Sequence, residues 1–260
     1  MNIIDTHSHL FLEEFDEDRA EVMARARQAG LTHIFMPNID SSTVEPLLRT
    51  CREYADLCHP MVGLHPTSVN ENYEDELKVV QRELETNVTA YCAIGEIGMD
   101  LYWDMTFLEQ QQVVLRRQFD WALQYNLPVV IHCREAFAPI YNIMQDYRGT
   151  SLRGIFHSFT GTADEAAAVL EFPGFYIGVN GVVTFKKSQL PQVLCSVPLE
   201  RVVLETDSPY LTPAPNRGKR NESARITDTL FKVAEVYGRS AENVADITSK
   251  NALKVFGMLK

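Results

Sequence analysis

The sequence predicts a closed α/β barrel of eight parallel strands, the (β/α)8 or TIM-barrel fold, formed by a single domain over residues 1–260. Short apolar segments alternate with segments of helical periodicity, and this strand-helix pair recurs eight times. The length of 260 residues is also usual for such a barrel. An open doubly wound sheet would give the same alternation, but the count of eight and the length favour the closed barrel.

The expected strands are short apolar runs, as in parallel sheets with both faces covered. In chain order they fall at 3–9, 33–37, 61–66, 90–97, 128–132, 154–157, 175–179 and 201–206. The expected helices fall at 16–30, 42–56, 74–86, 106–125, 135–147, from 162 onward, 187–195, 226–237 and 241–259. Three helices should open with a capping box, a Ser or Thr followed three residues later by Glu. The pairs are Ser42 with Glu45, Thr106 with Glu109, and Thr162 with Glu165.

Composition narrows the class of protein. The net charge of −11 argues against tight non-specific binding to duplex DNA, which depends on many phosphate contacts. It leaves room for an enzyme whose bound divalent ions make the site locally positive. The five cysteines are scattered without a Cys-x-x-Cys motif, which indicates reduced thiols and a cytoplasmic location. We expect no membrane span and no signal peptide, because neither pattern occurs.

Polar side chains mark the ends of the predicted strands. His7 and His9 share one face of the first strand, because side chains alternate along a strand. Alone, this pair is as consistent with two core histidines as with two metal ligands. The later strands end in His65, Glu96, His132, His157 and Asp207.

Five of the seven histidines therefore lie at one end of the predicted barrel, whereas His33 and His59 begin strands at the other end. Active sites of such barrels gather at the C-terminal ends of the strands. Four histidines and two carboxylates at this end suit two divalent ions with one bridging carboxylate. The pattern predicts a site for divalent metal ions.

Six motifs occur in the order Asp-Thr-His-Ser-His, Gly-Leu-His-Pro, Gly-Glu-Ile-Gly-Met-Asp, His-Cys-Arg-Glu-Ala, His-Ser-Phe-Thr-Gly and Glu-Thr-Asp-Ser-Pro-Tyr-Leu. This set resembles the TatD family of metal-dependent deoxyribonucleases, which belongs to the amidohydrolase superfamily. The resemblance runs from about residue 3 to residue 257. It departs at Met99, where Leu is usual, and at Ser223, where Asn-Glu-Pro is usual.

The resemblance implies a role for each matched residue. One ion would be held by His7, His9 and Asp207, a second by His132 and His157, and Glu96 would bridge them. His65 would lie close to the substrate phosphate. The ions would be Mg²⁺ or Mn²⁺ by the resemblance, whereas the softness of imidazole ligands also suits Zn²⁺.

Two carboxylates have open roles beside these ligands. Asp207 could serve as the general base for the attacking water, or as a ligand only. Glu205 shares its face and could orient a ligand histidine or form a structural salt bridge. Asp5 shares the face of His7 and His9, and we expect it to support them without ligating.

The substrate would meet cationic and aromatic side chains near the strand ends. Arg134 has a planar guanidinium suited to phosphate, and the basic loop 216–221 with Arg217 and Arg220 follows the eighth strand, where barrels often bind phosphate. Among the aromatic residues near strand ends, Trp103 and Tyr210 are the leading candidates for stacking on bases.

The resemblance implies a two-metal 3′-5′ exodeoxyribonuclease, and a site recessed among loops is expected to prefer single-stranded DNA or frayed ends. The alternative is a hydrolase of the same superfamily acting on a small ester, lactone or amide, since the metal cage alone serves both reactions. A non-enzymatic metal-binding protein is disfavoured, because no ligand is missing. We expect no obligate protein partner.

Overall fold

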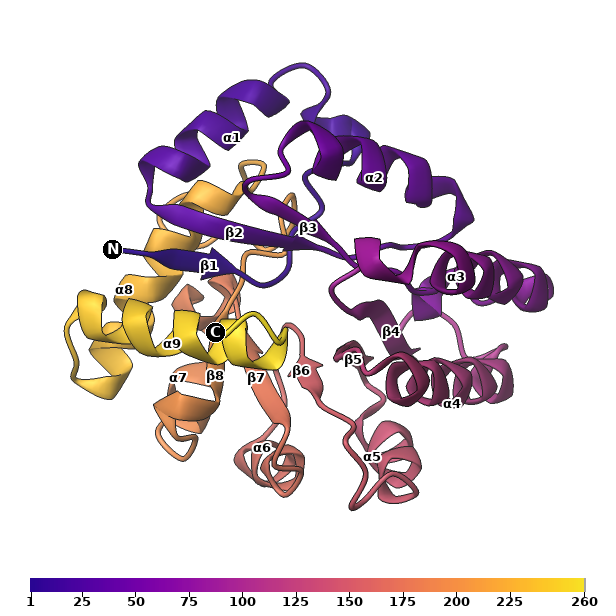
Figure 1. The fold of residues 1–260 in the computed structure, drawn as a ribbon. Coiled ribbons are helices and arrows are strands. Elements are labelled where there is room, and N and C mark those ends of the chain that lie inside the picture. Colours follow the sequence, from indigo (N-terminus) through magenta and orange to yellow (C-terminus); the bar gives the residue numbers. More distant parts are fainter. Residues whose placement is uncertain (260) are drawn as a thin grey trace.

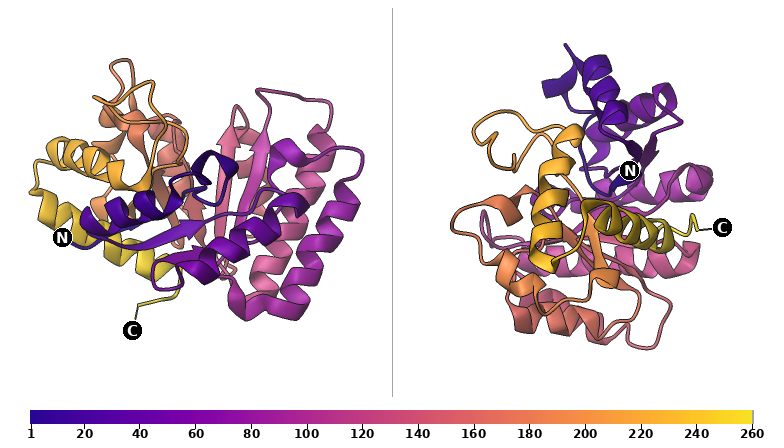
Figure 2. Two further views of the ribbon diagram at one scale, coloured as in Figure 1. Left: turned by 90° about the horizontal axis from the view of Figure 1, so that it is seen from above. Right: turned by 90° about the vertical axis from the view of Figure 1, so that its left-hand side faces the viewer.

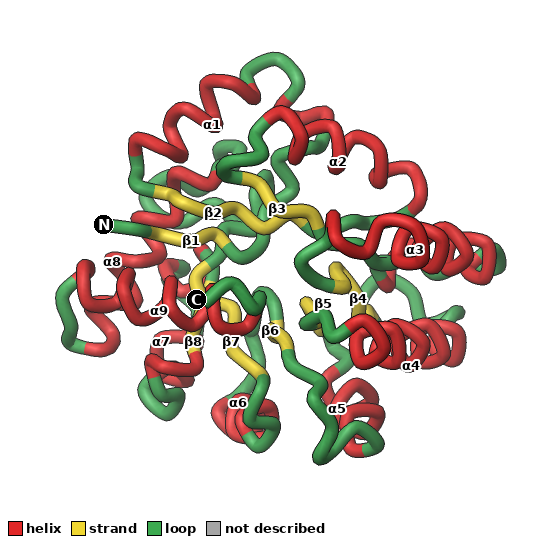
Figure 3. The backbone as a smooth tube through the Cα atoms, viewed as in Figure 1, coloured by secondary structure: helices red, strands yellow, loops and turns green. Residues whose placement is uncertain are grey.

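The structure, a computed structural model, describes residues 1–259, so that residue 260 of the predicted domain lies outside the described range. Strands and helices alternate along this range (Figures 1 and 3). The strands are β1 (Ile3–Asp5), β2 (Leu31–Met36), β3 (Cys58–Pro60), β4 (Ile94–Asp100), β5 (Val129–Arg134), β6 (Gly154–Phe156), β7 (Phe175–Val179) and β8 (Val202–Leu204). The α-helices are α1 (Arg19–Gln28), α2 (Val44–Glu53), α3 (Tyr73–Asn87), α4 (Leu108–Tyr125), α5 (Phe137–Gln145), α6 (Ala163–Leu170), α7 (Leu190–Leu194), α8 (Ile226–Tyr237) and α9 (Ala241–Val255).

The strands form a closed parallel barrel. Parallel pairing joins β1-β2-β3 in one group and β4-β5-β6-β7-β8 in another. Backbone hydrogen bonds join the two groups on both sides. Gly95 N–H on β4 donates to Val62 O, just after β3, at 3.0 Å, and Thr6 N–H, just after β1, donates to Leu204 O on β8 at 3.0 Å. Helices α1 to α8 surround the strands, as Figure 1 shows. The predicted fold class is confirmed.

One end of the barrel interior is apolar and closed by helix α9. Each strand or its flank contributes one side chain to this cluster, namely Ile4, Phe35, Met61, Ala93, Val130, Ile155, Tyr176 and Val203. Phe256, just after α9, stacks on Phe35 with ring centroids 3.7 Å apart. On most strands these residues precede the ligand-type side chains in the chain, as Ile4 precedes His7 and Val130 precedes His132, so the polar groups lie beyond this cluster.

The loop between β8 and α8 extends from that opposite end. Residues 205–222 contain no helix or strand, and in both views of Figure 2 this loop projects away from the C-terminus.

None of the helices described over residues 1–259 combines the length and apolar character that a membrane span requires.

Several element boundaries differ from the predicted ones. The third strand lies at Cys58–Pro60, ahead of the expected 61–66, and β4 continues past residue 97 to Asp100. The capping box of Thr162 with Glu165 is confirmed. The other two boxes are wrong. Asp40 caps the turn before α2, where its Oδ1 accepts from Ser42 N–H at 3.0 Å, and α4 begins at Leu108 without a side-chain cap.

Candidate metal centre

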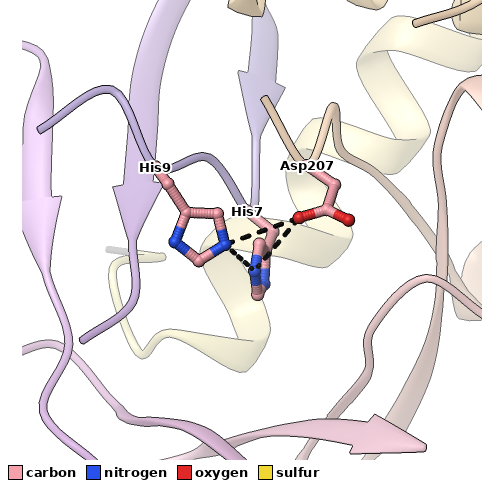
Figure 4. Close-up of side chains that lie close together, drawn as sticks. All are labelled: His7, His9 and Asp207. Carbon is pink, nitrogen blue, oxygen red and sulfur yellow. Dashed lines mark hydrogen bonds and ion pairs between the residues drawn. The ribbon is translucent and has the colours of Figure 1, made fainter. Parts of the chain in front are cut away.

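The first group of ligand-type side chains lies where β1 and β8 end (Figure 4). The Nε2 atoms of His7 and His9 are 3.1 Å apart, and Asp207 Oδ1 lies 3.8 Å from the former and 3.5 Å from the latter. Asp207 N–H donates to His7 O at 2.9 Å, and His9 N–H donates to Ser208 O at 2.8 Å. Asp207 has a φ of +57°, a left-handed conformation that is uncommon outside glycine and recurs at functional sites. The ends of two strands thus bring three side chains to one point.

Glu96 connects this group to a second group of imidazoles. Its Oε2 lies 3.1 Å from His7 Nε2 and 3.7 Å from His9 Nε2. Its Oε1 lies 2.9 Å from His132 Nδ1, 3.2 Å from His65 Nε2 and 3.8 Å from His157 Nε2. The two oxygens of one buried carboxylate therefore face two different sets of nitrogens.

The donor set fits divalent metal ions. Imidazole nitrogens and carboxylate oxygens converge here, and within residues 1–259 no lysine or arginine forms an ion pair with Glu96 or Asp207. Such donors suit Zn²⁺ and Mn²⁺. The Nδ1 atoms of His7 and His9 are buried without a hydrogen-bond partner within residues 1–259, so their Nε2 atoms are the ones aimed at the centre. These side chains therefore form a candidate metal site.

Glu205 contacts the ring nitrogen of His157 that faces away from the centre. Glu205 Oε1 lies 3.0 Å from His157 Nδ1 and accepts from Ser158 N–H at 2.5 Å. The opposite ring nitrogen, His157 Nε2, then points to the centre, 3.7 Å from Asp207 Oδ2. Space for Glu205 comes from Gly178, where a Cβ atom would lie only 2.5 Å from Glu205 Oε2. This contact favours the orienting role for Glu205 over a salt bridge unrelated to the site.

Asp5 supports the backbone and touches neither imidazole ring. Its Oδ1 accepts from Thr206 N–H at 2.9 Å and from His7 N–H at 3.3 Å, and its Oδ2 accepts from the Thr206 hydroxyl at 2.7 Å. Burial raises the pKa of Asp5 to about 7. Asp5 thus fixes the backbone of His7 and that of Thr206, the residue before Asp207.

Burial and close charges shift the pKa values at the centre in opposite directions. Burial raises the pKa of Glu96, but the imidazoles of His65 and His7 outweigh it and hold that pKa well below its usual value. Burial lowers the pKa of His7 to about 4. Burial also lowers the pKa of His157, but the carboxylates of Glu205 and Asp207 outweigh it and raise that pKa to about 10. Glu96 and His7 therefore rest in the charge states that bind cations.

Asp100 is a site residue that the sequence reasoning missed. Its Oδ2 lies 2.9 Å from His132 Nε2, on the side of the ring opposite Glu96. The prediction ended the fourth strand at residue 97, whereas β4 runs to Asp100 and carries this residue to the same edge as Glu96. The signal was present, since an even spacing along a strand places both carboxylates on one face.

A cavity of about 710 Å³ opens over the centre. It is lined by the centre's His9, Glu96, His132, His157 and Asp207, and by four of the predicted substrate-binding residues, His65, Trp103, Arg134 and Tyr210. Trp103 and Tyr210 are 68% and 51% exposed, so their rings are free to meet a ligand. Arg134 places its guanidinium 3.9 Å from the centroid of the Tyr102 ring.

Arg217 and Arg220 do not reach this cavity. Arg217 stacks on Phe185, with its guanidinium carbon 3.7 Å from the ring centroid. Arg220 pairs with Asp18 at 2.6 Å and donates to the Glu14 carbonyl. The contact of Arg220 with substrate stays a prediction, and the structure shows that its charge is paired with the residue that precedes α1.

Fold and site together define the class of protein, a barrel hydrolase that depends on metal ions. Residues 4–257 match the model of the TatD related DNase family, and the chain belongs to this family. The uncharacterized metal-dependent hydrolase YabD of Bacillus subtilis is 34% identical over 255 residues, covering 98% of both chains. A protein of Pantoea ananatis named 3′-5′ ssDNA/RNA exonuclease TatD is 30% identical over 263 residues, covering 99% of this chain and 100% of its own. The crystal structure of the TatD homologue YjjV of Escherichia coli superposes with a TM-score of 0.91 at 28% identity, covering 98% of each chain.

Proposed function

We propose that this hydrolase removes nucleotides from the 3′ end of single-stranded DNA, using two divalent ions held by the predicted ligands. The observation that carries the proposal is the position of Glu96, whose two oxygens face two separate groups of nitrogens. His7, His9 and Asp207 lie close enough together to hold one ion, and Glu96 and His132 lie close enough, together with His65, to hold a second. We assign His157 to the second ion, because its Nε2 lies 3.8 Å from Glu96 Oε1. The bound ions would polarise the phosphoryl group and lower the pKa of the attacking water. Their identity is Mg²⁺, Mn²⁺ or Zn²⁺.

The side chains of the chain position the reactants. Burial raises the pKa of Asp207, but His157, His9 and His7 together outweigh burial and lower that pKa, so the group is held as the carboxylate, which is the form that accepts a proton from water. Asp207 is therefore assigned both roles, ligand and general base. His65 and Arg134 line the cavity and are placed to hydrogen-bond to phosphate oxygens.

The mouth of the cavity favours an unpaired strand. Trp103 and Tyr210 present exposed rings there, and bases stack on such rings without much sequence preference. A duplex keeps its bases stacked on one another, so its ends must fray before a base can reach these rings. The names of the relatives that refer to single-stranded DNA and RNA support this substrate class.

The test compares single-stranded DNA labelled at the 3′ end with the same strand labelled at the 5′ end, in Mg²⁺ and in Mn²⁺. The 3′ label should be released first as a mononucleotide, and Glu96→Gln should lower the rate at least about 100-fold, because it removes a bridging ligand. Glu109→Gln, the same change at an exposed site on α4, is the matched control. Early release of the 5′ label would overturn the polarity.

A matched panel of RNA, an ester, a lactone and an amide tests the alternative substrates. Hydrolysis of a lactone or amide without cleavage of DNA would replace the nuclease proposal with the small-substrate one. We further propose that residues 1–260 act as one domain in the cytoplasm without an obligate protein partner, in keeping with five cysteines that form no disulfide in the described residues.

A further inference from the structure

We propose that Asp100 is a positioning residue that fixes the metal-facing side of His132 and the aromatic turn at the cavity mouth at the same time. The inference rests on the proposed function only in taking His132 as a metal ligand. Asp100 is the last residue of β4, and its carboxylate is 2% exposed.

The two oxygens of Asp100 have separate partners. Oδ2 lies 2.9 Å from His132 Nε2. Oδ1 accepts from the backbone N–H groups of Tyr102 at 3.1 Å and of Trp103 at 3.3 Å. One carboxylate therefore joins the imidazole to the turn that carries the exposed rings.

Carboxylates flank both ring nitrogens of His132 at 2.9 Å, Glu96 at Nδ1 and Asp100 at Nε2, and only Glu96 also faces the other imidazoles of the centre. A carboxylate oxygen accepts a hydrogen, so Asp100 favours the ring form with the hydrogen on Nε2. The lone pair then lies on Nδ1, which is 2.9 Å from Glu96 Oε1 and faces the centre. A carboxylate behind a ligand histidine commonly fixes its ring and strengthens metal binding.

The backbone of Asp100 is itself held by helix α4. Gln111 is buried, its side-chain oxygen accepts from Asp100 N–H at 2.9 Å, and its side-chain nitrogen donates to Asp100 O at 3.2 Å. Asp100 therefore has little freedom to leave either partner. A shift of this residue must move the ring, the turn, or both.

The turn at Tyr102 and Trp103 lies beside Arg134, and we assign Trp103 and Arg134 to substrate binding. The Arg134 guanidinium carbon lies 3.9 Å from the Tyr102 ring centroid and 5.0 Å from that of Trp103. Trp103 and Arg134 both line the cavity. Asp100 thus links metal binding to the recognition of the substrate strand.

An amide cannot replace this carboxylate, because three hydrogen-bond donors surround it and an amide offers only one acceptor oxygen. In Asp100→Asn, the oxygen can serve either the turn or His132, and the NH2 group faces a donor on the other side. The change keeps the shape of the side chain. It therefore tests the hydrogen bonds with little effect on packing.

The experiment titrates metal-free wild type, Asp100→Asn and Asp104→Asn with Zn²⁺ by calorimetry and records the imidazole N–H resonances of the Zn²⁺-loaded proteins by NMR. Asp104 is the matched control, since it lies on the same loop, is exposed and accepts from Thr106 N–H without contacting His132 within the described residues. Asp100→Asn should weaken one of two Zn²⁺ sites about 10- to 100-fold and leave the other within about threefold. Wild type should show a slowly exchanging His132 Nε2–H that the variant loses, and the KM for a single-stranded oligomer should rise only in Asp100→Asn.

Equal Zn²⁺ affinities in all three proteins would overturn the inference. So would a wild-type spectrum with the His132 hydrogen on Nδ1, a result that needs no variant and so covers the case in which Asp100→Asn does not fold. If the Zn²⁺ and NMR results are as expected but no protein cleaves DNA, the positioning role stands and the nuclease proposal fails.

Discussion

At the scale of single residues, Glu96 and its neighbours are held by side chains that never reach the cavity. Glu205 fixes His157, and Asp5 fixes the backbone beside His7. Such outer contacts commonly change metal affinity by about 10- to 100-fold when they are lost. The site is therefore sensitive to substitutions that leave every ligand in place.

Gly178→Ala tests this sensitivity. The added Cβ would lie 2.5 Å from Glu205 Oε2 and 3.0 Å from its Oε1, so Glu205 must move away from His157. We expect Zn²⁺ affinity to fall about tenfold and the free energy of unfolding to fall by about 1–3 kcal/mol. Competition with a chromophoric chelator and denaturant titration measure the two effects.

The control for that variant is Gly174→Ala, in the loop before β7. Its Cβ would crowd the Arg153 Cβ at 2.7 Å, at the N-terminal ends of β6 and β7, whereas the proposed ligand His157 follows the C-terminal end of β6. It should lower stability and leave Zn²⁺ affinity unchanged. Equal Zn²⁺ affinity in Gly178→Ala and wild type would mean that Glu205 does not set the position of His157.

The proposed ligands were predictable because each lies at or near a strand end, and strand ends meet at one end of a parallel barrel. Asp100 was missed because the fourth strand was ended three positions too early. The pairing of Arg220 with Asp18 was not predictable, because 202 positions separate the two residues and no local pattern reveals such a pair. Local spacing thus predicts which residues share a face, but not which distant charges neutralise each other.

At the scale of elements, the alternation of strands and helices was readable because both faces of each strand are covered. The boundaries of these elements were less predictable. Short 3-10 turns, such as Ser41–Thr43 ahead of α2, carry the same polar residues as a helix N-terminus. The sequence pattern of a capping box therefore marks the approach to a helix without fixing its first residue.

The loops after the strands divide into those that line the cavity and those that tie the barrel together. Arg134, at the end of β5, lines the cavity, whereas Arg220, after β8, pairs with Asp18. Arg134→Met should raise the KM for single-stranded DNA about tenfold or more, since a charged hydrogen bond to phosphate is worth roughly 1.5–3 kcal/mol. Arg220→Met should leave that KM unchanged and lower the melting temperature by up to about 4 °C, because a partly exposed ion pair contributes at most about 1 kcal/mol.

Steady-state kinetics and thermal melts of the two methionine variants decide between these roles. A large rise in KM for Arg220→Met would return this arginine to the substrate, as the sequence first suggested. An unchanged KM for Arg134→Met would remove it from phosphate binding.

At the scale of the whole molecule, the residues proposed for catalysis and the apolar residues that stabilise the fold lie at different ends of the barrel. The metal centre lies at one end, and the apolar cluster closed by α9 lies at the other. The two histidines outside the site, His33 and His59, stack at 5.0 Å between ring centroids, and Phe35 of the apolar cluster lies against His59 at 5.1 Å. Both sit where the sequence placed them, away from the metal centre.

His59 makes stability depend on pH without involving the site. Burial lowers its pKa from 6.5 to about 4, so below pH 6.5 the unfolded chain binds a proton that the folded chain does not. Stability from this residue is complete above pH 6.5 and declines as the pH falls toward 4. His59→Leu should therefore lose less free energy of unfolding than wild type between pH 6.5 and pH 4 in denaturant titrations. Parallel curves for the two proteins would show that His59 titrates normally in the fold.

The central claim is that Glu96 bridges two ions, and electron paramagnetic resonance of the Mn²⁺-loaded protein tests it most directly. Two Mn²⁺ ions bridged by one carboxylate are magnetically coupled, so wild type with two equivalents should show a coupled spectrum. Glu96→Gln should show isolated Mn²⁺ and little cleavage of DNA. Isolated Mn²⁺ in the wild type, with full cleavage, would contradict the two-ion site.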